Sequence, residues 1–241
     1  MSPRGHGGPQ EPRRSRIEVS AEELSGDRAR ALVLTPVSRE TTARLDRFVA
    51  TLLEWQQRMN LISHSTEATV WTRHVADSLQ LLPLAPEARI WADLGAGGGF
   101  PGLAIACALA DTSGAQVHLV ESNGKKAAFL REAAKVTGAP VTVHPVRIEE
   151  FVENTTESFD VATARALAPL PALLAMAYPL LKKGALGLFP KGQDVGSELT
   201  EAAKCWSIQS GLVQSRTDAR GQIVVVRSLA PKSREKGSRR R

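Results

Sequence analysis

The residues best suited to chemistry form a glycine-rich segment that runs from Asp93 to Gly102 with the sequence DLGAGGGFPG. It follows an apolar run and opens a helical pattern, so it is expected to connect a strand to a helix. Glycines allow a tight turn and a close approach to a ligand, because no Cβ stands in the way. In α/β sheets, ligands bind beyond the carboxyl ends of the strands. The segment therefore predicts a site for a nucleotide-like cofactor.

Two cofactors are compatible with this segment. The stretch Gly97–Gly102 satisfies the G-x-G-x-x-G pattern of dinucleotide binding, and Glu121 lies at a suitable distance downstream for a ribose. Asp93, two residues before Gly95, completes the D-x-G-x-G-x-G pattern that is typical of S-adenosylmethionine-dependent methyltransferases. An antiparallel hairpin expected near the C-terminus also favours S-adenosylmethionine, because a dinucleotide fold would continue with parallel strands. An NAD-linked oxidoreductase is the alternative.

Candidate residues also follow the third and fourth expected strands. Residues 147–149 (Arg-Ile-Glu) are expected to border the adenine, and residues 163–166 (Thr-Ala-Arg-Ala) to face the transferable methyl group. Enzymes that methylate exocyclic amines carry an N/D-P-P-aromatic motif at the latter position, which this chain lacks. C5-pyrimidine methylation requires a cysteine nucleophile, and neither Cys107 nor Cys205 is expected near this edge. An acceptor with a free lone pair is therefore favoured. The two cysteines have no metal-ligand spacing, so no metal site is predicted.

An α/β sheet has to position these residues. From residue 89, short apolar runs alternate with amphipathic stretches, which indicates βα units and a parallel sheet. The expected strands are 89–94, 116–121, 141–145, 159–164 and 185–190, followed by an antiparallel hairpin at 207–213 and 222–228. The expected helices are 101–110, 125–136 and 171–181, preceded by two cap helices at 41–59 and 67–81.

The chain of 241 residues is accordingly divided into four segments. Residues 1–38, rich in Pro, Gly, Arg and Ser, are predicted to be largely disordered. Residues 39–88 form a helical cap. Residues 89–229 form a class I methyltransferase domain, a doubly wound, mostly parallel sheet with an antiparallel C-terminal hairpin. Residues 230–241 form a basic, disordered tail.

The net charge of +6 is concentrated at the C-terminus. Residues 227–241 carry seven Lys or Arg and one Glu, whereas residues 41–226 have a net charge of −1. Such a tail suits RNA phosphates, and a merely solvated end is the alternative. The chain has no run of about 18 uncharged apolar residues and no apolar N-terminal segment, so no membrane span or secretory signal is expected. A cytoplasmic location is predicted.

Several further motifs occur in order along the chain. They are Asn60-Leu61-Ile62, His74-x-x-Asp77-Ser78-Leu79, the glycine segment, Glu121-Ser-x-x-Lys125-Lys126-x-x-Phe129-Leu130 and Arg165-Ala166. Together they resemble the RsmG (GidB) family, which methylates a guanine N7 in the decoding region of bacterial 16S ribosomal RNA. The resemblance covers roughly residues 41–228. It implies S-adenosylmethionine as cofactor, 16S ribosomal RNA or the small ribosomal subunit as partner, and a monomer. A methyltransferase for another RNA site or a small molecule is the alternative, and a non-catalytic RNA-assembly module is a further one.

The resemblance also implies roles for single residues. Gly95, Phe100, Ile148, Glu149 and Arg165 match the family's cofactor contacts. The full set of predicted cofactor-binding residues is Asp93, Gly95, Gly97, Phe100, Glu121, Ile148, Glu149 and Arg165.

The expected reaction is an in-line displacement in which guanine N7 attacks the sulfonium methyl group. N7 carries no proton, so no general base is needed. Arg165 is the predicted catalytic residue. It is expected to hold the cofactor carboxylate, guanine O6 or a phosphate, since an arginine on N7 would block the attacking lone pair. His74 and Asp77 are interpreted as structural support, with RNA contact as the alternative.

Overall fold

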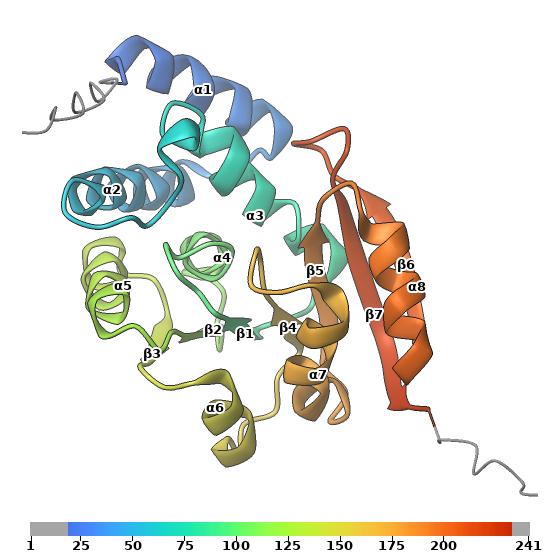
Figure 1. Cartoon of the computed structure of the whole chain (residues 1–241). Coiled ribbons are helices and arrows are strands. Elements are labelled where there is room, and N and C mark those ends of the chain that lie inside the picture. The colour runs from blue at the N-terminus through green and yellow to red at the C-terminus, as the bar shows by residue number, and fades with distance from the viewer. Residues whose placement is uncertain (1–18, 233–241) are drawn as a thin grey trace, which may run out of the picture.

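The computed structural model describes residues 19–232, which form a seven-stranded sheet with helices on both faces (Figure 1). The strand order is β3-β2-β1-β4-β5-β7-β6. The strands are β1 (Ile90–Leu94), β2 (Gln116–Val120), β3 (Val141–His144), β4 (Val161–Thr163), β5 (Leu186–Lys191), β6 (Trp206–Gln214) and β7 (Gln222–Pro231). Strands β1 to β5 are parallel, whereas β7 pairs antiparallel with both β5 and β6. The predicted mostly parallel sheet with a C-terminal hairpin is confirmed.

The strand order reverses between β1 and β4. The chain proceeds outward from β1 through β2 to β3 and then returns to β4 on the other side of β1. At such a switch point the connections from neighbouring strands diverge, which leaves a crevice at the carboxyl ends of the strands. The glycine segment after β1 and Arg165 after β4 both lie at this crevice, because Asp93 pairs in register with Thr163.

Two hydrophobic clusters cover the two faces of the sheet. On one face pack α2 (Arg39–Gln56), α4 (Gly102–Leu109) and α5 (Gly124–Thr137) (Figure 1). On the other pack α6 (Ile148–Asn154), α7 (Leu170–Leu181) and α8 (Val195–Cys205). The central strands are buried almost throughout, as expected for parallel strands between two layers of helices.

Helical segments precede the sheet, as predicted, but the second of them is irregular. Helix α2 matches the expected 41–59 helix closely. The expected helix at 67–81 is instead a π-helical turn, Trp71–Ala76, followed by the short α3 (Asp77–Leu79). Short 3₁₀ turns lie at His64–Thr66 and Leu82–Leu84. π-helical turns are frequent at functional sites, and this one carries His74.

The prediction of disorder for residues 1–38 is wrong for an N-terminal helix, α1 (Ala21–Leu34), which lies across the cap (Figure 1). A capping box starts this helix, because Ser20 Oγ accepts from the Glu23 N–H and the Glu23 carboxylate accepts from the Ser20 N–H. Asp27 is fully buried and accepts hydrogen bonds from the Trp71 N–H and from the Thr72 N–H and hydroxyl. Asp27 and Trp71 are 44 residues apart in the sequence, so the composition of residues 1–38 gives no indication of this contact. Residues 1–18 lie outside the described residues.

Three smaller differences concern local elements. Helices α6 and α8 were not predicted, and the residues expected in a loop at 148–149 form the first turn of α6. Strand β7 continues to Pro231, so the predicted disordered tail does not begin at residue 230. The Lys232 N–H donates to the Cys205 carbonyl at 2.8 Å, which ties the end of this strand to α8. The rest of the predicted tail, 233–241, lies outside the described residues.

The docking of α1 gives a prediction for stability. Asp27→Leu should lower the free energy of unfolding by about 2–4 kcal/mol, because it leaves one buried and one partly buried backbone N–H group without an acceptor. Urea unfolding followed by circular dichroism measures the change. Ser25→Ala, at an exposed position of the same helix, is the matched control and should stay within about 0.5 kcal/mol of the parent chain. Equal stability of the two variants would show that α1 does not depend on this contact.

Candidate active site

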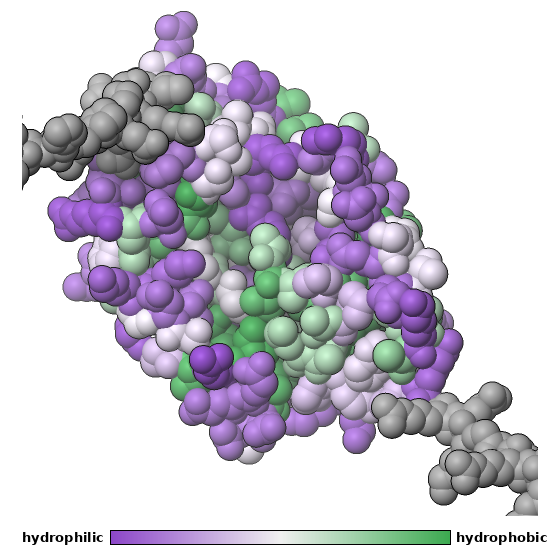
Figure 2. Space-filling model, viewed as in Figure 1, coloured by the Kyte–Doolittle hydropathy of each residue, from purple (hydrophilic) through white to green (hydrophobic). Residues whose placement is uncertain are grey.

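A cavity of about 960 Å³ lies at the carboxyl ends of the strands, between the sheet and the cap. Residues after β1, β2, β3, β4 and β5 line it, together with residues of the cap and of the β6–β7 turn. On the face of the molecule shown in Figure 2, hydrophilic residues predominate in the half that the cap occupies, and hydrophobic ones gather below its centre. The volume lies at the upper end of the range of typical ligand pockets, which measure roughly 300–1,000 Å³.

The glycine loop forms one wall of the cavity. Gly95 and Gly97 line it and have φ angles of 74° and 52°, which glycine adopts without strain. The N–H groups of Gly95 and Ala96 both donate to the Val120 carbonyl, so the loop is fastened to the end of β2. A Cβ at Gly98 would lie 2.8 Å from the Leu61 carbonyl oxygen. The loop therefore touches the cap directly.

Asp93 lies beneath this loop and does not line the cavity. Its side chain is fully buried, and Oδ2 accepts from the Gly102 N–H at 2.8 Å. Oδ1 is buried without a hydrogen-bond partner among residues 19–232. Burial raises the pKa of this carboxyl to about 7. The geometry thus makes Asp93 a support for the strand–loop–helix connection, in place of the direct cofactor contact that the motif suggested.

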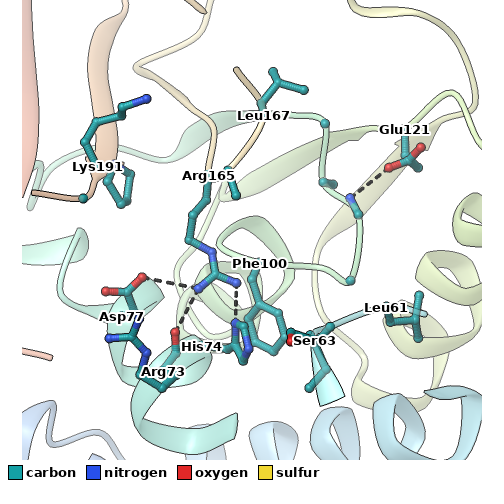
Figure 3. Close-up of a pocket in the computed structure, with 18 of the residues that line it drawn as sticks. Leu61, Ser63, Arg73, His74, Asp77, Phe100, Glu121, Arg165, Leu167 and Lys191 are labelled. Carbon is teal, nitrogen blue, oxygen red and sulfur yellow. Dashed lines mark hydrogen bonds and ion pairs between the residues drawn. The ribbon is translucent and has the colours of Figure 1, made fainter. Parts of the chain in front are cut away.

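Glu121 lies at the end of β2 and faces the cavity beside the glycine loop (Figure 3). Its Oε2 accepts from the Gly97 N–H at 3.0 Å and its Oε1 from the Asn123 N–H at 2.8 Å. Each carboxylate oxygen has a second lone pair that remains available to a ligand. Two backbone contacts therefore hold this carboxylate in place for binding hydroxyl groups.

The residues predicted to border an adenine also line the cavity. Ile148 and Glu149 are in the first turn of α6, and Val146 and Arg147 precede them. Val146 was not predicted, although its place after β3 follows from the rule that identified its neighbours. Of the two adjacent lysines in the fourth motif, Lys126 lines the cavity and Lys125 does not.

Arg165 follows β4 and reaches across the cavity to the cap (Figure 3). Its Nη1 donates to the Arg73 carbonyl at 2.9 Å and to Asp77 Oδ2 at 3.3 Å. The guanidinium carbon lies 5.4 Å from the centre of the Phe100 ring. The next residue, Ala166, has a φ of 52°, a left-handed conformation that is uncommon outside glycine and clusters at functional sites. Arg165 is thus held by the irregular segment of the cap.

His74 completes the contact with Arg165. Its Nδ1 lies 2.5 Å from Arg165 Nη2 and must accept, because a guanidinium has only donors. Nε2 then carries the proton and donates to Thr66 Oγ1 at 2.9 Å, and this hydroxyl donates to the Ser63 carbonyl. Burial, followed by the charge of Arg165, lowers the pKa of His74 to about 3. The imidazole is therefore neutral near pH 7 and positions Arg165.

Asp77, which was interpreted from the sequence as structural support, also lines the cavity. Asp77 Oδ1 accepts from Gln80 and from Thr217 of the β6–β7 turn, which connects the cap to the hairpin. Lys191, at the end of β5, pairs with Glu198 of α8 at 2.7 Å. Lys191 could have been predicted from the sequence, because it directly follows the strand expected at 185–190. Glu198 could not, because no sequence pattern indicated helix α8. Arg220, in the β6–β7 turn, does not line the cavity, and 76% of its side chain is exposed. No cluster of metal-ligating side chains occurs within residues 19–232.

Comparisons with known proteins agree with this geometry. A sequence model of the family described as rRNA small subunit methyltransferase G matches residues 41–226. The ribosomal RNA small subunit methyltransferase G of Bradyrhizobium sp. (strain ORS 278) is 58% identical over 211 residues, which cover 88% of this chain and 95% of that protein. The protein of the same name from Rhodopseudomonas palustris (strain BisB18) is 54% identical over 218 residues, 90% of this chain and 93% of that protein.

Solved structures show the same fold at low identity. The O-methyltransferase from Bacillus cereus in complex with SAH superposes with a TM-score of 0.57 at 16% identity, covering 86% of this chain and 99% of that one. TomG, an O-methyltransferase from Streptomyces achromogenes solved with SAM, gives 0.54 at 14% identity, covering 88% of this chain and 99% of that one. These likenesses establish the class I methyltransferase fold.

The raised pKa of Asp93 gives a prediction about pH. The ordinary pKa of an aspartate, 3.8, applies in the unfolded chain, whereas the pKa in the folded chain is about 7. Between these two values the folded chain keeps a proton that the unfolded chain has released. This contribution to stability is therefore complete below the unfolded pKa and is lost as the pH rises through the folded pKa. Asp93→Asn has no such carboxyl and keeps an oxygen for the Gly102 N–H.

The stability of Asp93→Asn relative to the parent chain should thus increase between pH 5 and pH 8, by on the order of 2 kcal/mol at about 1.4 kcal/mol per unit of pKa. Urea unfolding at the two pH values measures this difference. Parallel pH profiles for the two proteins would contradict a buried, titrating Asp93.

Proposed function

Because the chain belongs to the rRNA small subunit methyltransferase G family, we propose that it transfers the methyl group of S-adenosylmethionine to N7 of a guanosine in bacterial 16S ribosomal RNA. The observation that carries this proposal is the meeting of the glycine loop, Glu121 and Arg165 in one cavity at the switch point of the sheet. Membership of this family sets aside the alternative of an NAD-linked oxidoreductase.

The residues of the cavity fit S-adenosylmethionine. The two oxygens of Glu121 match a pair of ribose hydroxyls, and Ile148 offers an apolar side chain to the adenine. The backbone of Gly95 and Gly97 permits close approach of the methionine portion. Leu167 packs so closely against Gly95 that a Cβ there would lie 2.8 Å from one of its methyl carbons. Arg165, fixed next to Phe100, offers a positive charge to the cofactor carboxylate.

The reaction needs positioning and no proton transfer. S-adenosylmethionine supplies an electrophilic methyl group: N7 forms the new N–CH₃ bond while the S–CH₃ bond breaks, and the electron pair stays on sulfur. The positive charge passes to the purine, so little net charge develops. Both ring nitrogens of His74, the histidine that lines the cavity, are engaged in hydrogen bonds. This agrees with a reaction without a general base, in which orientation can contribute roughly 7–11 kcal/mol.

We further propose that the protein acts as a monomer in the cytoplasm, with the small ribosomal subunit or its 16S RNA as substrate. No helix within the described residues is long and apolar enough to cross a membrane. Methylation of another RNA site, or of a small molecule, is the competing function. A small-molecule enzyme would methylate free guanosine, whereas the proposed enzyme requires the ribosomal substrate.

The cofactor site can be tested without RNA. Glu121→Gln should weaken the binding of S-adenosylhomocysteine about tenfold, because hydrogen bonds to a charged group contribute roughly 1.5–3 kcal/mol. Isothermal titration calorimetry on the protein alone measures this. Glu132→Gln, exposed on α5 and outside the cavity, should bind like the parent chain. Unchanged affinity in Glu121→Gln would contradict the proposed contact between the ribose and this carboxylate.

The reaction is tested with labelled S-adenosylmethionine and small ribosomal subunits that lack the modification, followed by digestion and analysis for 7-methylguanosine. The parent chain should place label in that nucleoside. Arg165→Ala should reduce labelling about a hundredfold or more, the scale expected when one partner of a buried charged pair is removed. Arg131→Ala, exposed on α5, is the control and should label normally. Label in a different nucleoside would show that guanine N7 is not the acceptor.

A further inference from the structure

On the side of the cavity beyond Arg165, three cations are each paired with a carboxylate, and Asp194 is a further carboxylate that lines the cavity. The pairs are Arg165–Asp77, Arg73–Asp218 and Lys191–Glu198. A paired cation attracts a phosphate less strongly than a free one, and its geometry is fixed by its partner. This wall is therefore better suited to hydrogen-bonding a base than to capturing the RNA backbone.

Backbone groups hold both members of the Lys191–Glu198 pair in place. Lys191 Nζ lies 2.7 Å from Glu198 Oε2 and donates to the Ala168 carbonyl at 3.1 Å. Glu198 Oε2 also accepts from the Leu170 N–H at the start of α7. The two side chains are 12% and 22% exposed, and both line the cavity. The pair is thus a rigid feature of the wall, supported by β5, α7 and α8.

This pair has hydrogen-bonding capacity left over. An ammonium group has three donors, and two of those of Lys191 are used by Glu198 and Ala168. Within residues 19–232, no hydrogen bond reaches Glu198 Oε1, since both contacts of this carboxylate are made through Oε2. By contrast, both oxygens of Asp77 are occupied. The Lys191–Glu198 pair therefore offers one donor beside one acceptor.

A guanine presents the complementary pattern on its Watson–Crick edge, where the O6 acceptor is next to the N1–H and amino donors. Adenine presents an amino donor next to the N1 acceptor, so the same pair would meet it with like groups opposed. N7 lies on the other edge of the purine and is left free. An arginine that bound O6 and N7 together would occupy the nucleophile.

We propose that Lys191 and Glu198 recognise the acceptor guanine, with Nζ donating to O6 and Glu198 Oε1 accepting from the Watson–Crick donors. The inference rests on the proposed N7 methylation. Its geometry follows from the sheet, because β4 and β5 are parallel neighbours and carry Arg165 and Lys191 at the same edge. Figure 3 shows Arg165 between Glu121 on one side and Lys191 on the other. A cofactor whose ribose meets Glu121 leaves the Lys191 side for the base.

Glu198→Gln tests the proposal sharply. The amide oxygen can still accept from the Leu170 N–H, while the amide nitrogen places a donor against the donors of guanine. The methylation kcat/KM on unmodified subunits should fall about ten- to a hundredfold, the range of a paired base contact. The dissociation constant for S-adenosylhomocysteine should stay within about twofold, because the pair contacts the acceptor and not the cofactor. Glu201→Gln, on the same helix and paired with exposed Lys204, is the matched control.

Lys191→Met provides a second variant, of similar length and without a donor, and should show the same selective loss. Wild-type kcat/KM in both variants would overturn the proposal. A loss of kcat/KM matched by an equal loss of cofactor affinity would also overturn it, since that result indicates a structural role. Absence of 7-methylguanosine with the parent chain itself would instead contradict the proposed function.

Discussion

A guanidinium below the protein surface requires partners, and the site depends on how Arg165 obtains them. The residue belongs to the sheet, but its hydrogen bonds go to Arg73, His74 and Asp77 of the cap. The cap therefore supplies the hydrogen-bond acceptors for the guanidinium that the sheet carries. The cavity is defined only when the cap and the sheet are in contact. The contact of Gly98 with the Leu61 carbonyl draws the glycine loop into the same arrangement. The β6–β7 turn joins it as well, since Thr217 donates to Asp77.

The polar network also explains why the site suits a reaction that moves no proton. His74 is buried, accepts from a cation and donates to a hydroxyl, which together remove it from acid–base chemistry near neutral pH. Arg73, Arg165 and Lys191 are each paired with a carboxylate, which fixes their geometry. Fixed donors and acceptors favour precise placement of a base, which is the contribution that an in-line methyl transfer needs most.

The cap is itself supported from outside. Helix α1 places the buried carboxylate of Asp27 against the N–H groups of Trp71 and Thr72, at the start of the π-helical turn. This turn carries His74, and Asp77 follows it directly as the first residue of α3. A chain of contacts thus leads from the N-terminal helix to the turn and from the turn to Arg165. The N-terminal extension is in this way part of the scaffold of the site, although it lies before the region that the family model matches.

The elements that could be predicted from the sequence are those that short segments of the chain specify. The strand–loop–helix around Gly95–Gly102, the alternation of strands and helices, the C-terminal hairpin and the cavity positions of Glu121 and Arg165 all follow from local patterns and from the rule that strand ends meet at one edge. The burial of Asp93 under the loop, the docking of α1 on the cap and the pairing of Lys191 with Glu198 do not follow from such patterns. The docking of α1 depends on Trp71 and Thr72, far along the chain, and the Lys191–Glu198 pair depends on how β5 and α8 pack. Burial, pKa and pairing are properties of the assembled surroundings of a residue, and a local pattern does not contain them.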